Sequence, residues 1–238
     1  MNRFTHLWLP WSVYLPVFLA LTLGHWDFRI AEHLFYDARL QHWLGTGTGE
    51  WWARDLIHTG GAWMVKLIAA ATLIVWLSGY RIARLRDCRR DAAFAFFGIA
   101  AAVALIGVIK ATSNMDCPWD LQLFGGERPF VGLFETRPGS LPRAKCFPGA
   151  HSGSAFALFV FYFIARQNRS KYSRQILVAA LLLGAIFAFG QQARGAHFMS
   201  HDLTSAMLVW TLLYGLTSLR YRMPRHRRPQ HALVNEES

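Results

Sequence analysis

The chain has 238 residues, of which 53% are hydrophobic and only 16% are charged. The apolar residues come in long blocks, whereas a soluble domain of this size would distribute them at helical or strand periods. This pattern excludes an ordinary soluble domain and predicts an integral membrane protein. The formal net charge is +11, but no nucleic-acid recognition motif accompanies it. We therefore expect no nucleic-acid partner and attribute the basic residues to membrane topology and contact with anionic lipid.

Six segments approach the roughly 20 apolar residues that a membrane-spanning helix needs. In chain order they are residues 7–26, 62–80, 92–110, 150–165, 175–191 and 203–219. The predicted fold class is all-α, an integral membrane bundle of six transmembrane helices. No small-x-small cleavage site follows the first segment, so we expect a retained anchor rather than a secretory signal. We expect one membrane domain over residues 1–223 and a disordered basic tail over residues 224–238.

The basic residues predict the orientation of this bundle. They concentrate in residues 81–90, 166–174 and 220–228. With six spans, these three segments and the amino terminus lie on one side, which the positive-inside rule makes the cytoplasm. We expect both termini to be cytoplasmic, in a bacterial inner membrane. The connections 27–61, 111–149 and 192–202 then face the periplasm.

The three cysteines agree with that orientation. Cys88 lies among the predicted cytoplasmic arginines, where a thiol stays reduced. Cys117 and Cys146 bracket the long outer connection on the oxidising side. We predict a disulfide between them, and the alternative is a pair of buried free thiols.

Polar residues gather at the predicted outer ends of the spans. Lys110 ends the third span, and Gly149, Ala150 and His151 open the fourth. A glycine beside a helix start lets backbone N–H groups approach an anion, and the helix dipole favours negative charge there. A phosphate therefore suits the position just before His151.

A second polar cluster lies directly before the last span. It contains Arg194, His197, His201 and Asp202. If this stretch is helical, the histidines at 197 and 201 share a face, and one ring can hydrogen-bond the other. Polar groups gathered at one membrane face are costly to keep and usually functional. The two clusters together predict an active-site face at the periplasmic lipid boundary.

The stretch from Lys110 to Asp202 resembles the type 2 phosphatidic acid phosphatase superfamily of membrane lipid phosphatases. That family has three signatures: Lys, six residues, Arg-Pro; Pro-Ser-Gly-His; and Ser-Arg, five residues, His, three residues, Asp. Lys110 and Pro118 match the first signature, but Cys117 stands at its arginine. Pro148 and His151 match the second, with Gly149 and Ala150 replacing serine and glycine.

The third signature is recognisable but shifted. His197 matches its histidine, Gln191 stands at its arginine, and Arg194 lies three residues before His197 instead of six. His201 falls at its acid, and the carboxylate follows one residue later as Asp202. We interpret the chain as a divergent active member of the superfamily, with an inactive relative as the alternative.

The resemblance implies covalent catalysis without a metal or other cofactor. His197 would attack the phosphorus, and His151 would protonate the leaving oxygen and then activate water. His201 or Asp202 would orient the nucleophilic ring. Lys110 and Arg194 would hold the phosphate oxygens, together with the backbone at Gly149 and Ala150. The missing arginine would be replaced by one of four outer-loop cations: Arg128, Arg137, Arg143 or Lys145, of which Arg143 and Lys145 lie nearest His151 in sequence.

The implied function is removal of phosphate from a membrane lipid phosphate or pyrophosphate on the periplasmic side. Undecaprenyl pyrophosphate, phosphatidylglycerophosphate, phosphatidic acid and lipid A phosphates all fit a site at headgroup level. One alternative is a phosphotransferase that uses a polyprenyl pyrophosphate donor. A second is a metal-dependent membrane hydrolase or transporter built on the three histidines and an acid, and a third is a non-catalytic lipid-binding protein. The oligomeric state remains open.

Overall fold

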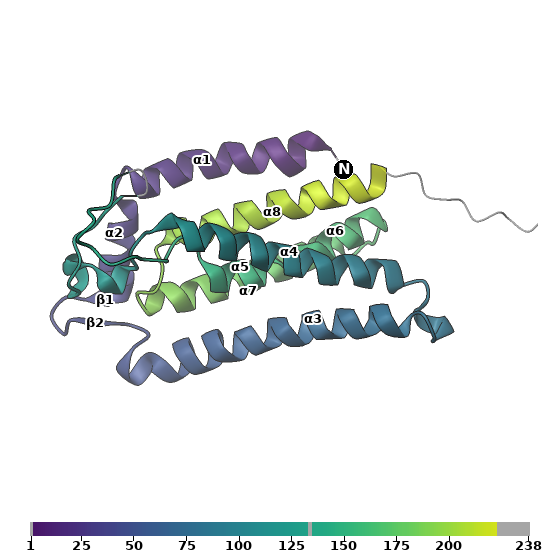
Figure 1. The fold of residues 1–238 in the computed structure, drawn as a ribbon, viewed down its shortest axis with the longest axis horizontal. Coiled ribbons are helices and arrows are strands. Elements are labelled where there is room, and N and C mark those ends of the chain that lie inside the picture. The colour runs from purple at the N-terminus through teal and green to yellow at the C-terminus, as the bar shows by residue number, and fades with distance from the viewer. Residues whose placement is uncertain (1, 133–134, 223–238) are drawn as a thin grey trace, which may run out of the picture.

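The structure is a computed structural model that describes residues 2–132 and 135–222, so the predicted tail at 224–238 lies outside the described residues. Long helices lie side by side and form an elongated bundle (Figure 1). They are α1 (Leu9–Thr22), α3 (Gly61–Ser78), α4 (Arg89–Ser113), α5 (Ala150–Phe156), α6 (Phe159–Gln167), α7 (Ser173–Ala193) and α8 (Met199–Arg222). The protein is thus all-helical in character, as its sequence predicts.

Each predicted span coincides with helix, but the segments differ in how well they suit a membrane. Among the described residues, four segments are long and apolar enough to cross: Phe4–Thr22, Gly47–Ser78, Arg89–Asp120 and Ser173–Ala193. The predicted span 150–165 is divided between α5 and α6, and neither helix reaches membrane length. The helix α8 is long but carries more polar side chains than the others.

Short elements cover the end of the bundle where the outer connections meet. They include the π-helical turns Ala31–Phe35 and Trp51–Gly60, the helix α2 (Trp26–Ile30), and the 3₁₀ turns Gly47–Gly49, Pro118–Asp120 and Gln122–Phe124. Two short antiparallel strands, β1 (Tyr36–Asp37) and β2 (His42–Trp43), pair Tyr36 with Trp43. Two short elements lie at the opposite end of the bundle: the π-helical turn Phe4–Trp8 leads into α1, and the 3₁₀ turn Ala83–Leu85 connects α3 and α4 (Figure 1).

Aromatic side chains join these covering elements to the bundle. Tyr36 and Trp43 pack against Phe124 of the outer loop, with ring centroids 5.4 and 5.1 Å away. Phe198, just before α8, lies in the same buried cluster. The cluster therefore fixes the outer layer on the loop that leads into α8.

The apolar core lies between α4, α6 and α8. Phe159, Phe163 and Leu213 are almost completely buried within it. At Gly98 of α4 a Cβ would lie 2.8 Å from Val160 and 3.2 Å from Leu213. Small residues at such positions let helix backbones approach closely, which is how helices associate where lipid supplies no hydrophobic driving force.

The first helix is attached to α8 largely through polar side chains. Tyr14 and Thr204 share a hydrogen bond of 2.8 Å, and Trp11 Nε1 donates to Thr211 over 3.1 Å. Near the amino terminus, His6 Nε2 lies 2.9 Å from the Tyr162 hydroxyl. Inter-helix hydrogen bonds of this kind are expected between helices surrounded by lipid.

Asp27 of α2 holds the start of α8. Its carboxylate Oδ1 accepts the Ser200 N–H over 3.0 Å, although the two residues are far apart in sequence. Burial raises the pKa of Asp27, and hydrogen bonds from Ser200 and Met199 oppose that shift. A carboxylate at a helix amino end satisfies a free N–H group and interacts favourably with the helix dipole. Asp27 therefore fixes where α8 begins.

We expect Asp27→Ala to lower the free energy of unfolding by about 1–2 kcal/mol, because the α8 cap is lost. Asp27→Asn keeps an acceptor oxygen and should cost less. Thermal unfolding in one detergent, followed by circular dichroism, measures both variants. Equal stability of Asp27→Ala and the wild type would show that the cap contributes nothing.

Candidate active site

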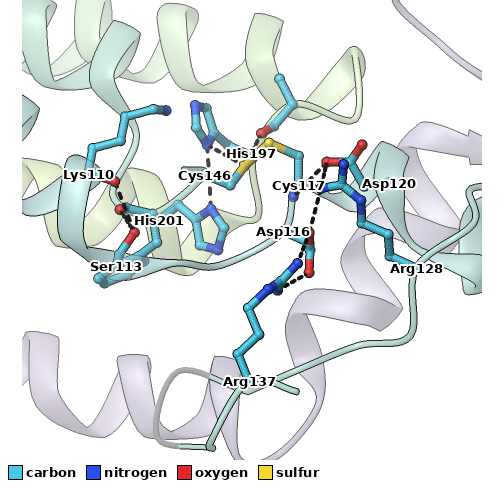
Figure 2. Close-up of a disulfide and its surroundings, with 12 residues drawn as sticks. Lys110, Ser113, Asp116, Cys117, Asp120, Arg128, Arg137, Cys146, His197 and His201 are labelled. Atoms are coloured by element: carbon cyan, nitrogen blue, oxygen red, sulfur yellow. Dashed lines mark hydrogen bonds and ion pairs between the residues drawn. A yellow bond between two sulfur atoms is a disulfide. The ribbon is translucent and has the colours of Figure 1, made fainter. Parts of the chain in front are cut away.

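Most of the predicted site residues gather at one end of the bundle. They come from the end of α4, the start of α5, the loop between α7 and α8, and the first turn of α8. Figure 2 shows Lys110, His197 and His201 around the Cys117–Cys146 disulfide. The separate sequence signatures thus meet in space, as expected for one site.

His197 and His201 contact each other through their Nδ1 atoms, which lie 3.4 Å apart. Both side chains are buried, His197 at 7% exposure and His201 at 0%. His197 lies in the loop after α7, where Gly195 has φ +70°, a conformation that suits glycine. A Cβ at Gly195 would also collide with Trp43 of β2. The loop therefore needs glycine to present His197.

The structure contains the predicted disulfide between Cys117 and Cys146, whose Cα atoms are 5.1 Å apart. Cys146 Sγ lies 3.5 Å from His197 Nδ1, so the disulfide packs directly against the histidine pair. The Cys146 N–H also donates to the Met115 carbonyl over 2.9 Å. The bond joins both ends of the outer connection and places them beside His197.

The histidine pair and Cys146 also resemble a metal-ligand set. One candidate ligand atom from each of the three residues lies within 4.8 Å of the others. However, Cys146 is oxidised, and a disulfide sulfur cannot supply the thiolate that zinc binds. The donor chemistry present therefore does not fit a zinc site at this position.

His197 lies in a strongly perturbing environment. Burial lowers its pKa well below the usual range, and the nearby charges of Lys110, His201 and His151 lower it further. Figure 2 shows the Lys110 ammonium directed toward the His197 ring. A neutral imidazole is the form that can act as a nucleophile. The site therefore favours the neutral form of the His197 imidazole.

His151 of α5 is held by its surroundings in a defined orientation. Its Nε2 lies 3.1 Å from the Ile57 carbonyl, an acceptor, so Nε2 carries the proton and donates. The ring stacks on Phe187 of α7 at 4.3 Å. These contacts leave Nδ1 as the ring nitrogen available for proton transfer.

His58 is a neighbour of the site that the sequence analysis missed. It lies on the π-helical stretch before α3, and its ring centroid is 4.7 Å from that of His151. The only signal in the sequence was its place just before an apolar segment at the predicted outer face. The family signatures do not include that position. Only the packing of η4 (Trp51–Gly60) against α7 shows that His58 lies at the site.

Of the two candidates for orienting His197, the structure places His201 in contact and uses Asp202 elsewhere. Asp202 Oδ1 accepts from Ser152 Oγ over 2.6 Å, and Oδ2 accepts from Gln192 Nε2 over 2.9 Å. Asp202 is 2% exposed and thus joins α5, α7 and α8 in the interior. The one-residue shift in the third signature therefore exchanges a carboxylate for an imidazole beside His197.

Arg194 ends α7 and is partly buried at the site. Its guanidinium lies 6.0 Å from the centre of the Trp119 ring. Burial is the main cause that lowers the pKa of Arg194, and the nearby charge of Arg54 lowers it further. A guanidinium remains charged under all ordinary conditions, so Arg194 supplies a fixed positive charge here.

The backbone before His151, which was predicted to hold a phosphate, lies where α5 begins close to α8. The Gly149 N–H donates to the His201 carbonyl over 3.2 Å, so it already has a protein partner. A Cβ at Gly149 would meet the Asp202 carboxylate and lie 2.7 Å from Ser152 Oγ. Ala150 is exposed. In the structure Gly149 thus serves the close approach of α5 and α8.

Of the four outer-loop cations proposed to replace the missing arginine, three are bonded to protein groups of the outer layer and one is exposed. Arg128 and Arg137 both form ion pairs with buried Asp116, at 2.8 and 2.5 Å. Arg143 donates to the Ala111 carbonyl at the end of α4 over 2.5 Å, and Lys145 is exposed. The first two cations stabilise the outer loop.

Gln191 stands at the position of the third-signature arginine. Its side chain is 3% exposed, and its Nε2 has no hydrogen-bond partner within residues 2–132 and 135–222. A buried amide donor without a partner costs free energy, so such groups call for an explanation. The sequence analysis noted the position but assigned it no role.

The profile of the PAP2 superfamily matches residues 91–225, which include the histidines and the disulfide. The chain therefore belongs to the PAP2 superfamily, whose members are phosphatases. Comparison with curated proteins and with solved structures gave no match. The family, the apolar helices and the site together define a membrane protein of the phosphoester hydrolase class.

We expect Gly149→Ala to lower the free energy of unfolding by about 1–3 kcal/mol, because the new methyl group collides with the Asp202 carboxylate. Gly107→Ala is the matched control, since a Cβ at Gly107 meets nothing within 4 Å. Thermal unfolding compares the two variants. A Gly149→Ala protein as stable as Gly107→Ala would show that α5 and α8 are not so closely packed.

We expect an alkylating maleimide to label one thiol per chain in the folded protein, the exposed Cys88. Reduction under denaturing conditions should raise the count to three, because Cys117 and Cys146 are then released. Intact-mass spectrometry counts the labels, and the Cys88→Ser variant should take none before reduction. Three labels before reduction would contradict the disulfide.

Proposed function

We propose that this protein is a membrane lipid phosphatase that works through a phosphohistidine on His197. The observation that carries the proposal is the environment of that ring: it is buried, kept neutral, adjacent to the Lys110 charge, and contacted at Nδ1 by His201. If His197 donates its Nδ1 proton to His201, its Nε2 has a free electron pair. That nitrogen can attack phosphorus.

The reaction has two displacements. First, the His197 Nε2 electron pair forms a bond to phosphorus, the ester P–O bond breaks, and protonated His151 gives its Nδ1 proton to the leaving alcohol oxygen. Second, His151 takes a proton from water, the water oxygen attacks phosphorus, and the P–N bond breaks. Inorganic phosphate leaves and His197 is regenerated. The Ile57 carbonyl supports this role because it holds the His151 ring by its other nitrogen.

The charge of the transferred phosphoryl group needs fixed positive partners. Lys110 and Arg194 supply them, since phosphoryl transfer depends mostly on positioning and charge stabilisation. The unpartnered Nε2 of buried Gln191 is a further donor suited to a phosphate oxygen. A neutral amide in place of an arginine gives this site less positive charge than the family signature describes.

A lipid substrate follows from the surroundings of the site. The histidines follow or begin helices at one end of the bundle, and we place that end at the depth where a lipid phosphate meets its hydrocarbon tails. We propose six membrane crossings, with α5 and α6 forming one of them, cytoplasmic termini, and a site that faces the periplasm of a bacterial inner membrane. Isoprenoid pyrophosphates, phosphatidylglycerophosphate and phosphorylated glycolipids fit this location.

We expect His197→Ala to abolish phosphate release from lipid phosphates and His151→Ala to reduce kcat by about 10²–10⁴-fold, the usual range for a general acid or base. His33→Ala, an exposed histidine of the same outer layer, is the matched control and should retain wild-type activity. The assay measures inorganic phosphate from a panel of lipid phosphates in detergent.

Further measurements separate the proposed mechanism from its competitors. Vanadate should inhibit, EDTA should not, and acid-labile phosphate should be trapped on the wild type but not on His197→Ala. Activity that EDTA abolishes would favour the metal-dependent alternative. Phosphate transferred to a second lipid, without release to water, would favour the phosphotransferase. Unchanged hydrolysis by His197→Ala would reject the proposed nucleophile.

A further inference from the structure

A cavity of about 300 Å³ lies on the other side of His201 from His197. It is enclosed by the end of α1, the start of α2, the outer connection and the first turn of α8. The volume is at the lower end of the roughly 300–1,000 Å³ typical of small-molecule sites. His201 lines this cavity but His197 does not, so it is distinct from the proposed phosphoryl-transfer site.

A buried polar atom without a partner belongs to the wall of this cavity. His201 is 0% exposed, its Nδ1 contacts His197, and its Nε2 has no hydrogen-bond partner within the described part of the chain. Figure 2 shows this second ring nitrogen pointing away from His197. Buried ring nitrogens are normally paired, so this one points to a ligand.

The tautomer of His201 decides which kind of atom it needs. The proposed function requires His197 to donate from Nδ1, and His201 Nδ1 must then accept. A neutral imidazole carries one proton, so the proton of His201 is on Nε2. The cavity must therefore receive a hydrogen-bond acceptor, such as a phosphate oxygen, at His201.

The other polar residues of the wall are Thr22, His25, Asp27, Glu135 and Ser200, and the two carboxylates among them have the opposite preference. Asp27 and Glu135 both line the cavity. Asp27 uses its Oδ1 to cap α8, and Glu135 accepts the Gly132 N–H through Oε2 over 2.9 Å, which leaves Oε1 of this exposed side chain available. Two carboxylates favour a positive group and repel an anion. The cavity thus needs a hydrogen-bond acceptor at His201 and favours a positive group near Asp27 and Glu135.

Aromatic rings complete a site for a positive headgroup. Phe28 lies between Phe130 and Phe198, with ring centroids 4.8 and 5.2 Å away, and all three rings line the cavity. Ammonium groups are attracted to aromatic faces, and quaternary ammonium ligands are recognised in this way. Leu21 and Leu23 at the end of α1 continue the wall with apolar side chains.

We propose that this cavity binds the headgroup of a zwitterionic phospholipid as a second lipid site. A phosphate oxygen of the lipid accepts from His201 Nε2–H, and its ammonium group lies among the phenyl rings near Asp27 and Glu135. The acyl chains leave along α1, whose exposed surface is apolar. Binding holds the His201 proton on Nε2, so that His201 Nδ1 accepts the hydrogen bond from His197. This consequence for His197 rests on the proposed function.

Native mass spectrometry of the delipidated protein tests the proposal without using its activity. Phosphatidylethanolamine, phosphatidylcholine and phosphatidylglycerol with identical acyl chains are added in turn. We expect one lipid molecule to bind per protein, and we expect the ethanolamine and choline lipids to bind about tenfold more tightly than the glycerol lipid. Glu135→Gln should reduce this preference, and Asp27→Asn with Glu135→Gln should remove it, because Asn keeps the α8 cap without the charge.

A cavity-filling variant and a matched control locate the binding. Leu23 is 66% exposed, so Leu23→Trp narrows the entrance with little risk to the fold, and it should weaken zwitterionic lipid binding about tenfold. Glu32→Gln removes the same charge from the same outer layer outside the cavity and should change nothing. Equal or tighter binding of phosphatidylglycerol would overturn the proposal, as would binding that Leu23→Trp and the double variant leave unchanged. If the protein hydrolyses no lipid phosphate of the panel but still binds zwitterionic lipid, the proposed function is rejected and the second lipid site is retained.

Discussion

The contact between the Nδ1 atoms of His197 and His201 is the interaction on which the rest of the site depends. Two buried imidazoles can share only one proton between those atoms while both are neutral, so the contact sets the state of both outer nitrogens. One of these becomes the proposed nucleophile. The other faces a cavity with carboxylate and aromatic walls. A single hydrogen bond thus links the two lipid sites that we propose.

The outer layer is assembled largely by specific polar and covalent links. Asp27 caps α8, the Cys117–Cys146 disulfide closes the outer connection, and Asp116 joins two loop arginines. These links act together with the buried aromatic cluster around Phe124, which joins the outer layer to the loop before α8. The Asp27 cap is on Ser200, beside His201 in the sequence, and the disulfide packs against His197.

Much of this arrangement could be predicted from the sequence. The parts that could not be predicted depend on contacts between segments far apart in the chain. Apolar blocks predicted helix in each of the six segments, because a span needs a certain length of apolar residues whatever its neighbours are. They did not predict the division of residues 150–165 into α5 and α6. Family spacing also identified His197 and His151. The four-residue spacing indicated that His201 could contact His197, but only the structure shows that Asp202 is bonded elsewhere, to Ser152 and Gln192. Spacing could not find His58, whose contact with His151 joins segments far apart in sequence.

The sequence by itself determined the membrane class, the superfamily and the residues available for phosphate chemistry, since these follow from composition and local spacing. Tertiary structure decided which polar atoms meet. It placed Asp202 on Ser152 and Gln192, and it assigned Gly149 to helix packing. The physical reason is that a hydrogen bond depends on distances of a few tenths of an ångström between groups on different helices. Only the packing of the whole bundle fixes such distances.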